Sequence, residues 1–463
     1  MSEIAYAYLR NSALLTSSEG SVLDIATSSG TGTSLGLSHP FFFSGFVEHP
    51  EVVAQALLVL ARISRTRFYV PPNTLAAELL AADPVVTSTP DGLRFEVFSV
   101  CGGVYARLDI SEAALDAQYI AHGVTNVDIN PPLRQALAGL RASEPLHMNI
   151  GDEHLRVTTL GAEAYEKRVP LPSRWLKGFA ETQLLCAQMT QIHELDAAMS
   201  RQFVRALPKS SSTKTVLWAT QSVRGLRLAA THTRGALCVA GPERLRVIEP
   251  LVRFSTRLRG YGSSSFDTGQ PSASAWVLDL PGARLSIGLS PEKSRGFSGE
   301  GAMLHALRRT HAAQDAENIG ERLNLEARID TAELAHDLRL EQARVQDALD
   351  LLAGTGQVGF DLAAQSYFHR PLPVPEHALC ELHPRLNAAR ELFAAQQIIP
   401  AGLGSFTVFS AQNIYQVVQA ETAEQDRCTC PWYAKYRGSR GPCKHVLATR
   451  LYSDSTQHEG SVS

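Results

Sequence analysis

Three cysteines and one histidine near the end of the chain have the types and spacing of metal ligands. Cys428 and Cys430 are two residues apart, as are Cys443 and His445, and twelve residues separate the two pairs. Residues i and i+2 of an extended segment point to the same side, so the first two thiols converge. A cysteine just before a helix and a histidine in its first turn converge as well. Four such ligands can close a tetrahedron.

The mixture of ligand types favours zinc. The site combines thiolates with imidazole and lacks iron–sulfur spacing. Four protein ligands leave no open position for water or substrate, which indicates a structural ion. Two alternatives are weaker: a Cys428–Cys430 disulfide would close a small, strained ring, and unrelated thiols would not produce a four-ligand pattern.

The segment CTCPWYAKYRGSRGPCKHVLA (428–448) resembles a SWIM zinc finger, whose pattern is C-x-C, a variable spacer and C-x-H between a hairpin and a helix. The whole chain is similar to bacterial stand-alone SWIM zinc finger proteins. This similarity rests on residues 432–435 and 441–442 of the spacer and on three further segments: TNVDINPP (125–132), VPLPSRWLKGFAE (169–181) and YFHRPLP (367–373). This resemblance implies contacts with DNA or protein. It also implies assemblies with MoxR-type AAA+ ATPases and von Willebrand factor A proteins.

The spacer of this finger is basic and aromatic. No Asp or Glu occurs from Arg427 to Ser453. The candidate contacts to nucleic acid or to a partner are Trp432, Tyr433, Lys435, Tyr436, Arg437, Arg440 and Lys444. Such residues can neutralise phosphates and stack on bases. They can equally offset the charge of the metal site and cover a thin core, and the sequence leaves both roles open.

Residues 303–373 predict a winged-helix-like domain. Asp330 and Thr331 can cap a helix over 332–338, a second helix follows over 341–356, and two strands come next. The second helix, where a DNA reader presents basic or amide side chains, carries more acids than bases: Glu341, Gln342, Arg344, Gln346, Asp347 and Asp350. We therefore expect this domain to dock protein.

The first half of the chain contains a repeated pattern of a helix followed by a hairpin. A helix over 50–62 precedes a hairpin over 83–100, and a helix over 242–253 precedes a hairpin over 274–290. A third copy begins at Pro131 and turns at Gly151 and Asp152. The pattern predicts an α+β fold with repeated helix-plus-hairpin modules. Chance repetition of a common unit is the alternative.

The predicted domains follow from these patterns. They are N-terminal α+β modules (1–207), a second α+β module (215–300), the winged-helix-like domain (303–373), the SWIM finger region (380–452) and a disordered tail (453–463). The polar segment 208–214 is the predicted internal linker. Residues 173–207 read as one or two helices.

Composition indicates an ordinary globular protein of several folding units. The chain has 463 residues, 44% hydrophobic and 19% charged, with a formal net charge of -3. This balance gives no global attraction to nucleic acid. The N-terminus does not read as a secretory signal, and the longest apolar run, 52–60, is too short to cross a membrane. Single cysteines at 101, 186, 238 and 380 do not form a disulfide framework, so we expect a cytoplasmic protein.

Enzymatic activity has little support in the sequence. The glycines at 30–36 precede no helix, and His377, Cys380 and His383 lack a fourth metal ligand. Cys101 has no identifiable base. We therefore expect a zinc-binding adaptor, not an enzyme, that docks protein partners in an ATPase-linked assembly. The alternative is a nucleic-acid-binding protein that uses the basic, aromatic finger.

Overall fold

The structure is a computed structural model of the chain. It describes residues 5–6, 13–17, 20–24, 41–68, 84–126, 129, 131–140, 144–150, 169–170, 173–210, 216–223, 225–263, 269–294, 296–297, 301, 303–304, 312–372, 384–420, 425–438 and 440–460. Three predicted features lie outside these residues: the glycines at 30–36, the turn at 151–152, and the His377, Cys380 and His383 group.

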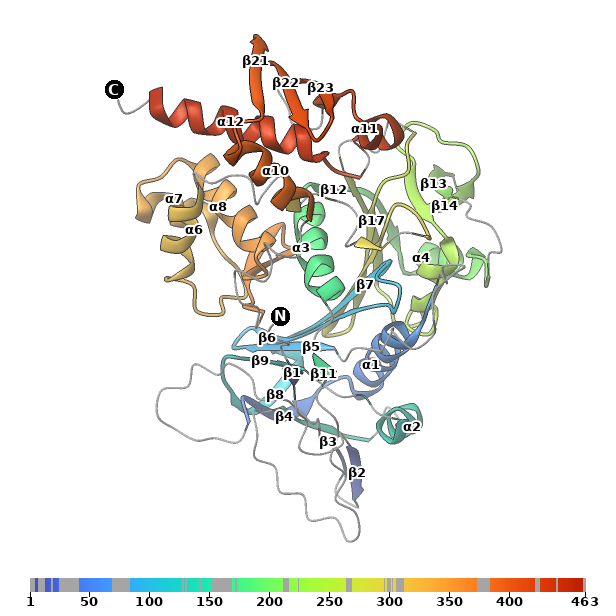
Figure 1. Ribbon diagram of the computed structural model, residues 1–463. Helices are drawn as coiled ribbons and strands as arrows, with labels where there is room; N and C mark the ends of the chain where they lie inside the picture. Colours follow the sequence, from blue (N-terminus) through green and yellow to red (C-terminus); the bar gives the residue numbers. More distant parts are fainter. Residues whose placement is uncertain are drawn as a thin grey trace.

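An eight-stranded antiparallel sheet forms the centre of the body (Figure 1). Its order is β12 (Met189–Asp196), β16 (Arg257–Ser263), β17 (Ser274–Leu280), β18 (Ala283–Leu289), β7 (Val104–Ser111), β6 (Gly92–Phe98), β5 (Val85–Thr89) and β9 (Gly123–Asn126). The hairpins predicted at 83–100 and 274–290 are β5–β6 and β17–β18. Gly92 ends the first turn at φ 136°, where an added Cβ would lie 2.1 Å from the carbonyl oxygen of Ile110.

The two predicted α+β modules share this sheet, because β18 pairs with β7 along its whole length. Strands from both sides of the predicted 208–214 linker therefore belong to one sheet. Helices and strands together confirm the α+β class. That the two halves are repeats stays a prediction, as do the domain boundaries.

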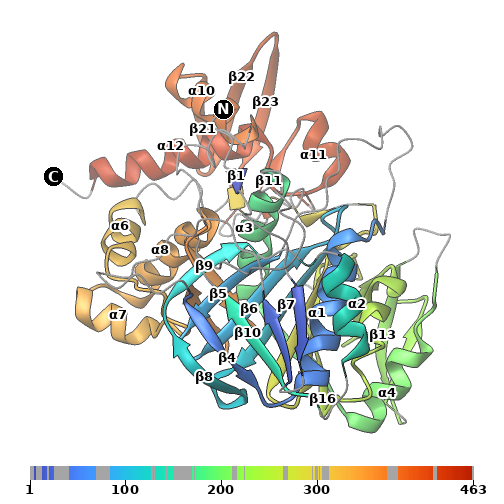
Figure 2. The ribbon, with the colours of Figure 1, turned by 90° about the horizontal axis from the view of Figure 1, so that it is seen from below.

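Helices cover both faces of the sheet. Helix α1 (Pro50–Arg65) contacts β6, β7 and β18 on one face and packs beside α2 (Pro131–Gly139), as Figure 2 shows. Helix α3 (Ser173–Ala187) lies on the other face, where Phe179 packs 5.0 Å from the Phe98 ring. The apolar side chains of α1 recur at helical spacing, and burying them fixes this helix on the sheet.

Smaller sheets flank this centre. One is five-stranded, in the order β2 (Ala13–Ser17), β3 (Gly20–Asp24), β10 (Leu146–Ile150), β4 (Phe43–Val47) and β8 (Leu115–Ile120). Another is three-stranded, in the order β14 (Gly225–Ala229), β13 (Val216–Ser222) and β15 (Leu237–Ala240). β1 (Ala5–Tyr6) pairs with β11 (Val169–Pro170), and two 3₁₀ helices are η2 (Glu112–Ala114) and η3 (Pro242–Ile248).

The prediction of one or two helices over 173–207 was wrong for the middle of this segment. Residues 189–196 form β12, and α4 (Ala197–Ala206) follows it directly. β12 pairs with β16 through most of its length, so sheet pairing overrides the local helical pattern. Asp196 ends the strand and caps α4, because its carboxylate accepts the Met199 backbone N–H at 2.8 Å.

Beside the α3 face, the segment 312–372 packs as helices followed by a hairpin. The elements are α6 (Ala313–Gly320), α7 (Thr331–Leu338), α8 (Gln342–Gly354), β19 (Val358–Asp361) and β20 (Ser366–His369). Asp330 caps α7 as predicted, accepting the backbone N–H groups of Ala332 and Glu333. That these elements form a winged helix stays a prediction.

Polar residues of α8 bond within the protein. Arg344 donates two hydrogen bonds of 2.9 Å to Asp315 of α6. Asp350 accepts from the Tyr367 hydroxyl at 2.7 Å and from Gln346 at 3.0 Å. These bonds tie part of the helix's polar surface to α6 and β20.

A charged centre joins the hairpin β19–β20 to the large sheet. Arg94, Asp109 and Arg284 lie directly opposite one another on β6, β7 and β18. Asp361 of the hairpin accepts from Arg284 at 2.5 Å and lies 3.1 Å from Arg107. Burial raises the pKa of Asp361, but the arginines outweigh burial and hold this pKa well below its usual range.

The C-terminal module lies above the body in Figure 1. It consists of α10 (Pro384–Ala394), a four-stranded sheet of β21 (Ile398–Gly402), β22 (Ser405–Ser410), β23 (Asn413–Val418) and β24 (Arg427–Cys428), then α11 (Pro431–Tyr436) and α12 (Lys444–Gly460). None of the helices in the described part of the chain combines the length and apolar character that crossing a membrane requires.

Helix α12 extends beyond the predicted start of the tail. The sequence predicted disorder from residue 453, but the helix continues to Gly460. The hydroxyls of Ser455 and Thr456 bond to the carbonyl of Tyr452, and Ser453 bonds to Gln419. These local bonds explain how a polar segment remains helical.

Candidate metal centre

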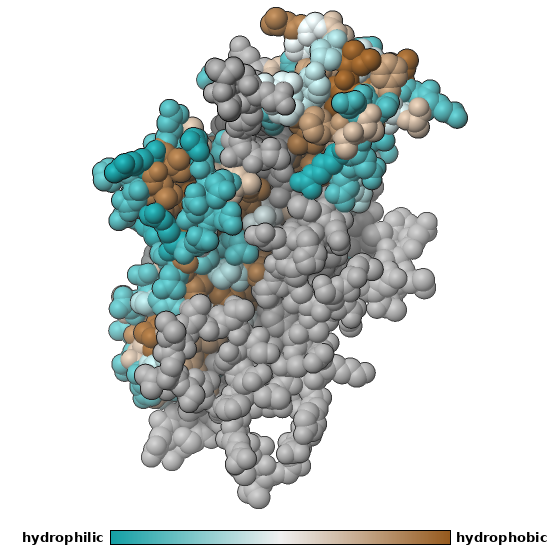
Figure 3. Space-filling view, turned by 60° about the vertical axis from the view of Figure 1, so that its left-hand side comes forward, coloured by the Kyte–Doolittle hydropathy of each residue, from teal (hydrophilic) through white to brown (hydrophobic). Residues whose placement is uncertain are grey.

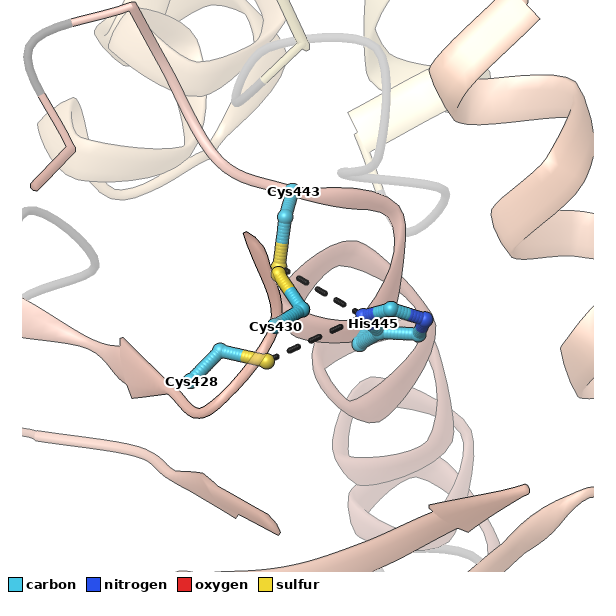
Figure 4. A group of neighbouring side chains, drawn as sticks. All are labelled: Cys428, Cys430, Cys443 and His445. Atoms are coloured by element: carbon cyan, nitrogen blue, oxygen red, sulfur yellow. Dashed lines mark hydrogen bonds between the residues drawn. The ribbon is translucent and has the colours of Figure 1, made fainter. Parts of the chain in front are cut away.

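The four predicted ligands come from three elements and meet at one point (Figure 4). Cys428 lies on β24, Cys430 is the N-cap of α11, Cys443 immediately precedes α12, and His445 lies in the first turn of α12. All four side chains are buried, and their ligand atoms lie within 4.8 Å of one another. The structure therefore brings together the whole predicted ligand set.

The distances between ligand atoms fit a tetrahedral zinc ion. His445 Nδ1 lies 3.7 Å from the sulfur of Cys428 and 4.0 Å from that of Cys443. With Zn–S near 2.3 Å and Zn–N near 2.0–2.1 Å, a sulfur and a nitrogen on one tetrahedral ion are about 3.6 Å apart. Nδ1 is thus the ring nitrogen placed to bind the metal.

Helix starts support the two thiolates next to them. Cys430 accepts the Tyr433 backbone N–H at 3.4 Å, and Cys443 accepts that of Val446 at 3.5 Å. Such donors favour the charged form of a thiol. Hydrogen bonds from the thiols of Cys428 and Cys443 also hold the pKa of Cys430 well below its usual range. Cys430 is therefore readily deprotonated, as a metal ligand must be.

The imidazole of His445 is held by packing. Its ring stacks on Tyr415 of β23 with centroids 4.3 Å apart. The second ring nitrogen, Nε2, is buried without a hydrogen-bond partner among the described residues. The aromatic stack therefore orients the ring in place of the carboxylate or carbonyl that commonly holds such histidines.

A family model for the SWIM zinc finger matches residues 415–451. Its span starts on β23, contains all four ligands and ends within α12. Residues 415–451 are a SWIM zinc finger. SWIM fingers bind zinc and commonly mediate interactions, so the predicted Zn²⁺ is confirmed and the finger suggests an interaction role.

Comparison with other proteins adds little beyond the finger. No curated protein matches the chain. The chain is similar to proliferating cellular nuclear antigen from Entamoeba histolytica, at a TM-score of 0.32 and 8% identity over 54% of this chain and 98% of that one. It is also similar to a PCNA2–PCNA3 complex from Sulfolobus tokodaii, at 0.33 and 7% over 54% and 100%. TM-scores of this size do not establish a shared fold.

The ligand set of this finger is that of a structural zinc ion, not of a catalytic one. Three thiolates and one imidazole fill a tetrahedral site and leave no position for a substrate. The residues Cys428, Cys430, Cys443 and His445 would hold the ion. Holding it links β24, the start of α11 and the start of α12.

The predicted contact residues of the spacer divide into two groups. Trp432, Tyr433, Tyr436, Arg440 and Lys444 are partly buried, whereas Lys435 and Arg437 are exposed. Arg440 packs over the Tyr436 ring at 5.0 Å, and Trp432 lies 4.5 Å from that ring. Part of the spacer therefore covers the finger, as one of the two open alternatives stated. Contact with nucleic acid or a partner stays a prediction.

An ion pair next to the finger was not predicted. Arg450 of α12 binds the buried Asp426 through hydrogen bonds of 2.8 and 2.5 Å. The sequence places Arg450 in a long run without acids, and Asp426 lies just before that run. The pair spans 24 positions, so no local spacing rule identifies it.

The remaining cysteines do not join a metal cluster in the described part of the chain. Burial raises the pKa of Cys186 to about 12 and that of Cys238 to about 11. These thiols stay protonated and behave as apolar side chains. Cys101 is half-buried, with its sulfur 3.5 Å from the Ser99 hydroxyl.

Proposed function

We propose that this protein is a zinc-dependent docking protein whose C-terminal module binds a protein partner. The observation that carries the proposal is the outer face of the sheet β21–β23. Five large hydrophobic residues are exposed in the described part of the chain, and four belong to this sheet: Ile399, Leu403, Ile414 and Val418. Clustered exposed apolar side chains commonly mark interaction sites.

The register of the sheet places Ile399, Ile414 and Val418 on one face, and Leu403 lies in the turn between β21 and β22. Phe409 pairs with Ile414, and Val418 lies between Ser405 and Arg427. Directly paired residues share a face, so the face carries apolar side chains on both β22 and β23. Alternate residues such as Phe406 and Val417 are buried on the inner side.

The inner side of the same sheet is already covered. Phe406 contacts Tyr452 of α12 with ring centroids 6.0 Å apart, and α12 contacts β21, β22 and β23. Figure 3 shows hydrophobic side chains gathered on this module at the top of the molecule. The sheet is packed on its inner face and presents exposed apolar side chains among polar ones such as Thr407 and Gln416 on its outer face, which fits a surface for a protein partner.

We propose no catalytic role. A cleft of about 470 Å³ opens over the ends of β5, β6 and β7, lined by Arg94, Asp109, Arg284 and Asp361. These charged groups pair with one another. Charged groups that are paired in this way stabilise the structure and are poorly suited to proton transfer.

The resemblance of the whole chain to bacterial stand-alone SWIM zinc finger proteins suggests which partners to test. MoxR-type AAA+ ATPases and von Willebrand factor A proteins are the candidates, and an ATPase-linked assembly in the cytoplasm is the proposed setting. The winged-helix-like segment is a second candidate for protein docking.

The second candidate function is nucleic-acid binding through the exposed Lys435 and Arg437 with Arg440 behind them. Arg427 adds a further exposed cation at the rim of the apolar face. Phosphate contacts of this kind lose affinity steeply as salt rises.

Two double variants distinguish protein docking from nucleic-acid binding. Ile414→Ser with Val418→Ser removes apolar side chains from the outer face, and Lys435→Gln with Arg437→Gln removes exposed charge. Binding of purified ATPase and von Willebrand factor A partners, and of single- and double-stranded nucleic acids, would be measured by biolayer interferometry across a salt series.

For protein docking, we expect the serine pair to weaken partner binding at least about tenfold and the glutamine pair to leave it nearly unchanged. Salt-sensitive nucleic-acid binding that the glutamine pair abolishes would favour the second function instead. Partner binding that the serine pair leaves intact would contradict the proposed surface.

A further inference from the structure

The loop that delivers Cys443 is held by an arginine from outside the finger. Arg385 lies on α10, thirty residues before the matched span of 415–451. Its Nη1 donates to the carbonyl oxygens of Arg440 at 2.8 Å and Pro442 at 2.9 Å. Pro442 immediately precedes Cys443, so these bonds fix the backbone that places the third ligand.

The same guanidinium also contacts the other end of the spacer. It lies over the Trp432 ring, with Cζ 4.5 Å from the ring centroid. Trp432 follows Cys430 by two positions, and its indole N–H donates to the carbonyl of Gly441 at 3.4 Å. Arg385 and Trp432 therefore hold the two ends of the spacer, and with them the two ligand pairs, at a fixed separation.

The body of the protein supports the loop from the opposite side. Gly301 has φ 100°, and an added Cβ would lie 2.9 Å from Gly441 Cα and 3.0 Å from the Arg440 carbonyl oxygen. The buried carboxylate of Glu181 on α3 accepts the Gly301 backbone N–H at 2.8 Å. The backbone of Gly301 is thus held tightly against the loop, at a position where no residue larger than glycine fits.

Charge gives Arg385 a second effect on the site. Three thiolates and a neutral imidazole around Zn²⁺ leave a buried net charge of about −1, and a buried charge needs a compensating partner. Burial and the neighbouring Arg440 lower the pKa of Arg385, whereas the negative charges of Glu181 and Cys443 raise it. The guanidinium is therefore close enough to the metal ligand for the two to interact electrostatically.

We propose that Arg385 of α10 is a positioning residue for the zinc site, and that Gly301 of the body completes the support. The zinc affinity of this protein then depends on residues that the SWIM pattern does not contain. Folding of the body and metal binding by the finger are then coupled through the contact of Gly301 with the loop.

The first test measures zinc affinity and release in the full-length protein. Arg385→Ala, Arg385→Lys and the control Arg390→Ala, on the same helix, would be challenged with a chromophoric chelator. Loss of second-sphere partners costs about 10–100-fold in metal affinity, so we expect that loss and faster release for Arg385→Ala. Arg385→Lys keeps the charge and should recover part of the affinity. Wild-type affinity and release in Arg385→Ala would overturn the proposal.

A second measurement reports on ligand geometry. Co²⁺ in place of Zn²⁺ gives absorption bands whose positions depend on the arrangement of the thiolates, and a merely structural role for Arg385 would not move them. Gly301→Ala leaves Arg385 intact but pushes a methyl group against Gly441, so we expect it to shift the bands and hasten release too.

This variant also guards against misfolding. Should Arg385→Ala fail to fold, Gly301→Ala provides the same readouts, with far-UV circular dichroism as the check of the body. Unchanged cobalt bands and unchanged zinc release in folded Gly301→Ala would contradict support of the loop by the body.

Discussion

Two of the buried charged centres in the described part of the chain are neutralised in different ways. In the finger, three cysteines and a histidine from residues 428–445 gather negative charge that a metal ion must balance. Under the hairpin β19–β20, Arg94, Arg107 and Arg284 pair with Asp109 and Asp361 of the same chain. We therefore expect the finger to depend on zinc for its fold, whereas the charged groups of the body are paired within the chain.

The difference has a consequence for how each centre fails. Removing one zinc ligand removes the ion and with it most of the energy that folds the finger. Removing one member of the arginine–aspartate centre leaves the others in place, but with an uncompensated buried charge. The first loss should be local and complete, and the second should be partial and spread over the body.

The largest expected effect is that of Cys443→Ser. Structural zinc sites contribute about 10–16 kcal/mol of binding free energy, so we expect this variant to lose its zinc and unfold roughly the last fifty residues. Elemental analysis and limited proteolysis would measure this. Cys101→Ser, outside the site, should keep one zinc per chain. Zinc retained in Cys443→Ser would refute the ligand assignment.

A smaller effect is expected for Asp361→Asn. Breaking a buried ion pair costs about 3–5 kcal/mol, because Arg107 and Arg284 lose a carboxylate that they share. Chemical denaturation followed by circular dichroism would show a lower midpoint for the body, with the zinc content unchanged. Asp337→Asn, at an exposed position of α7, is the control. Loss of zinc from Asp361→Asn would show that the two centres do not fail independently.

The smallest effect concerns pH and His369, at the end of β20 beside the charged centre. The Leu325 backbone N–H donates to His369 Nδ1 at 2.8 Å, so the imidazole is neutral. Burial lowers the pKa of His369 to about 4, below an unfolded value of about 6.5. The unfolded chain therefore binds more protons between these values. This contribution to stability is full above pH about 6.5 and is lost as the pH falls toward 4.

His369→Asn tests this assignment, because an amide oxygen can accept the same N–H. We expect thermal midpoints of the wild type to fall from pH 6.5 to 4 by more than those of His369→Asn, with His336→Asn, an exposed histidine, behaving as wild type. The expected difference is at most about 3 kcal/mol. Identical pH profiles for wild type and His369→Asn would remove His369 as the cause.

Much of the finger follows from the sequence because its geometry is local. Two residue pairs at i, i+2, one along an extended segment and one at a helix start, specify four convergent ligands. Turn residues at Pro90–Gly92 and Pro281–Gly282 likewise specify two hairpins, and Asp330 specifies the start of α7. In each case the interacting groups lie within a few residues of one another or follow one fixed pattern.

Long-range pairing decided the rest. The segment 189–196 has a helical neighbour on each side, yet it is a strand because β16 offers it a partner. The charged centre joins residues as far apart as 94 and 361, and no sequence pattern links them. The exposure of Ile399 and Ile414 follows from α12 occupying the other face of their sheet.

The sequence by itself determined that zinc is bound and by which residues, because the ligands lie close along the chain. Only the tertiary structure decided what surrounds them. Arg385 reaches the spacer from another helix, and Gly301 reaches it from the body. Contacts of this kind depend on packing across the whole fold, which residue types and local spacing do not encode.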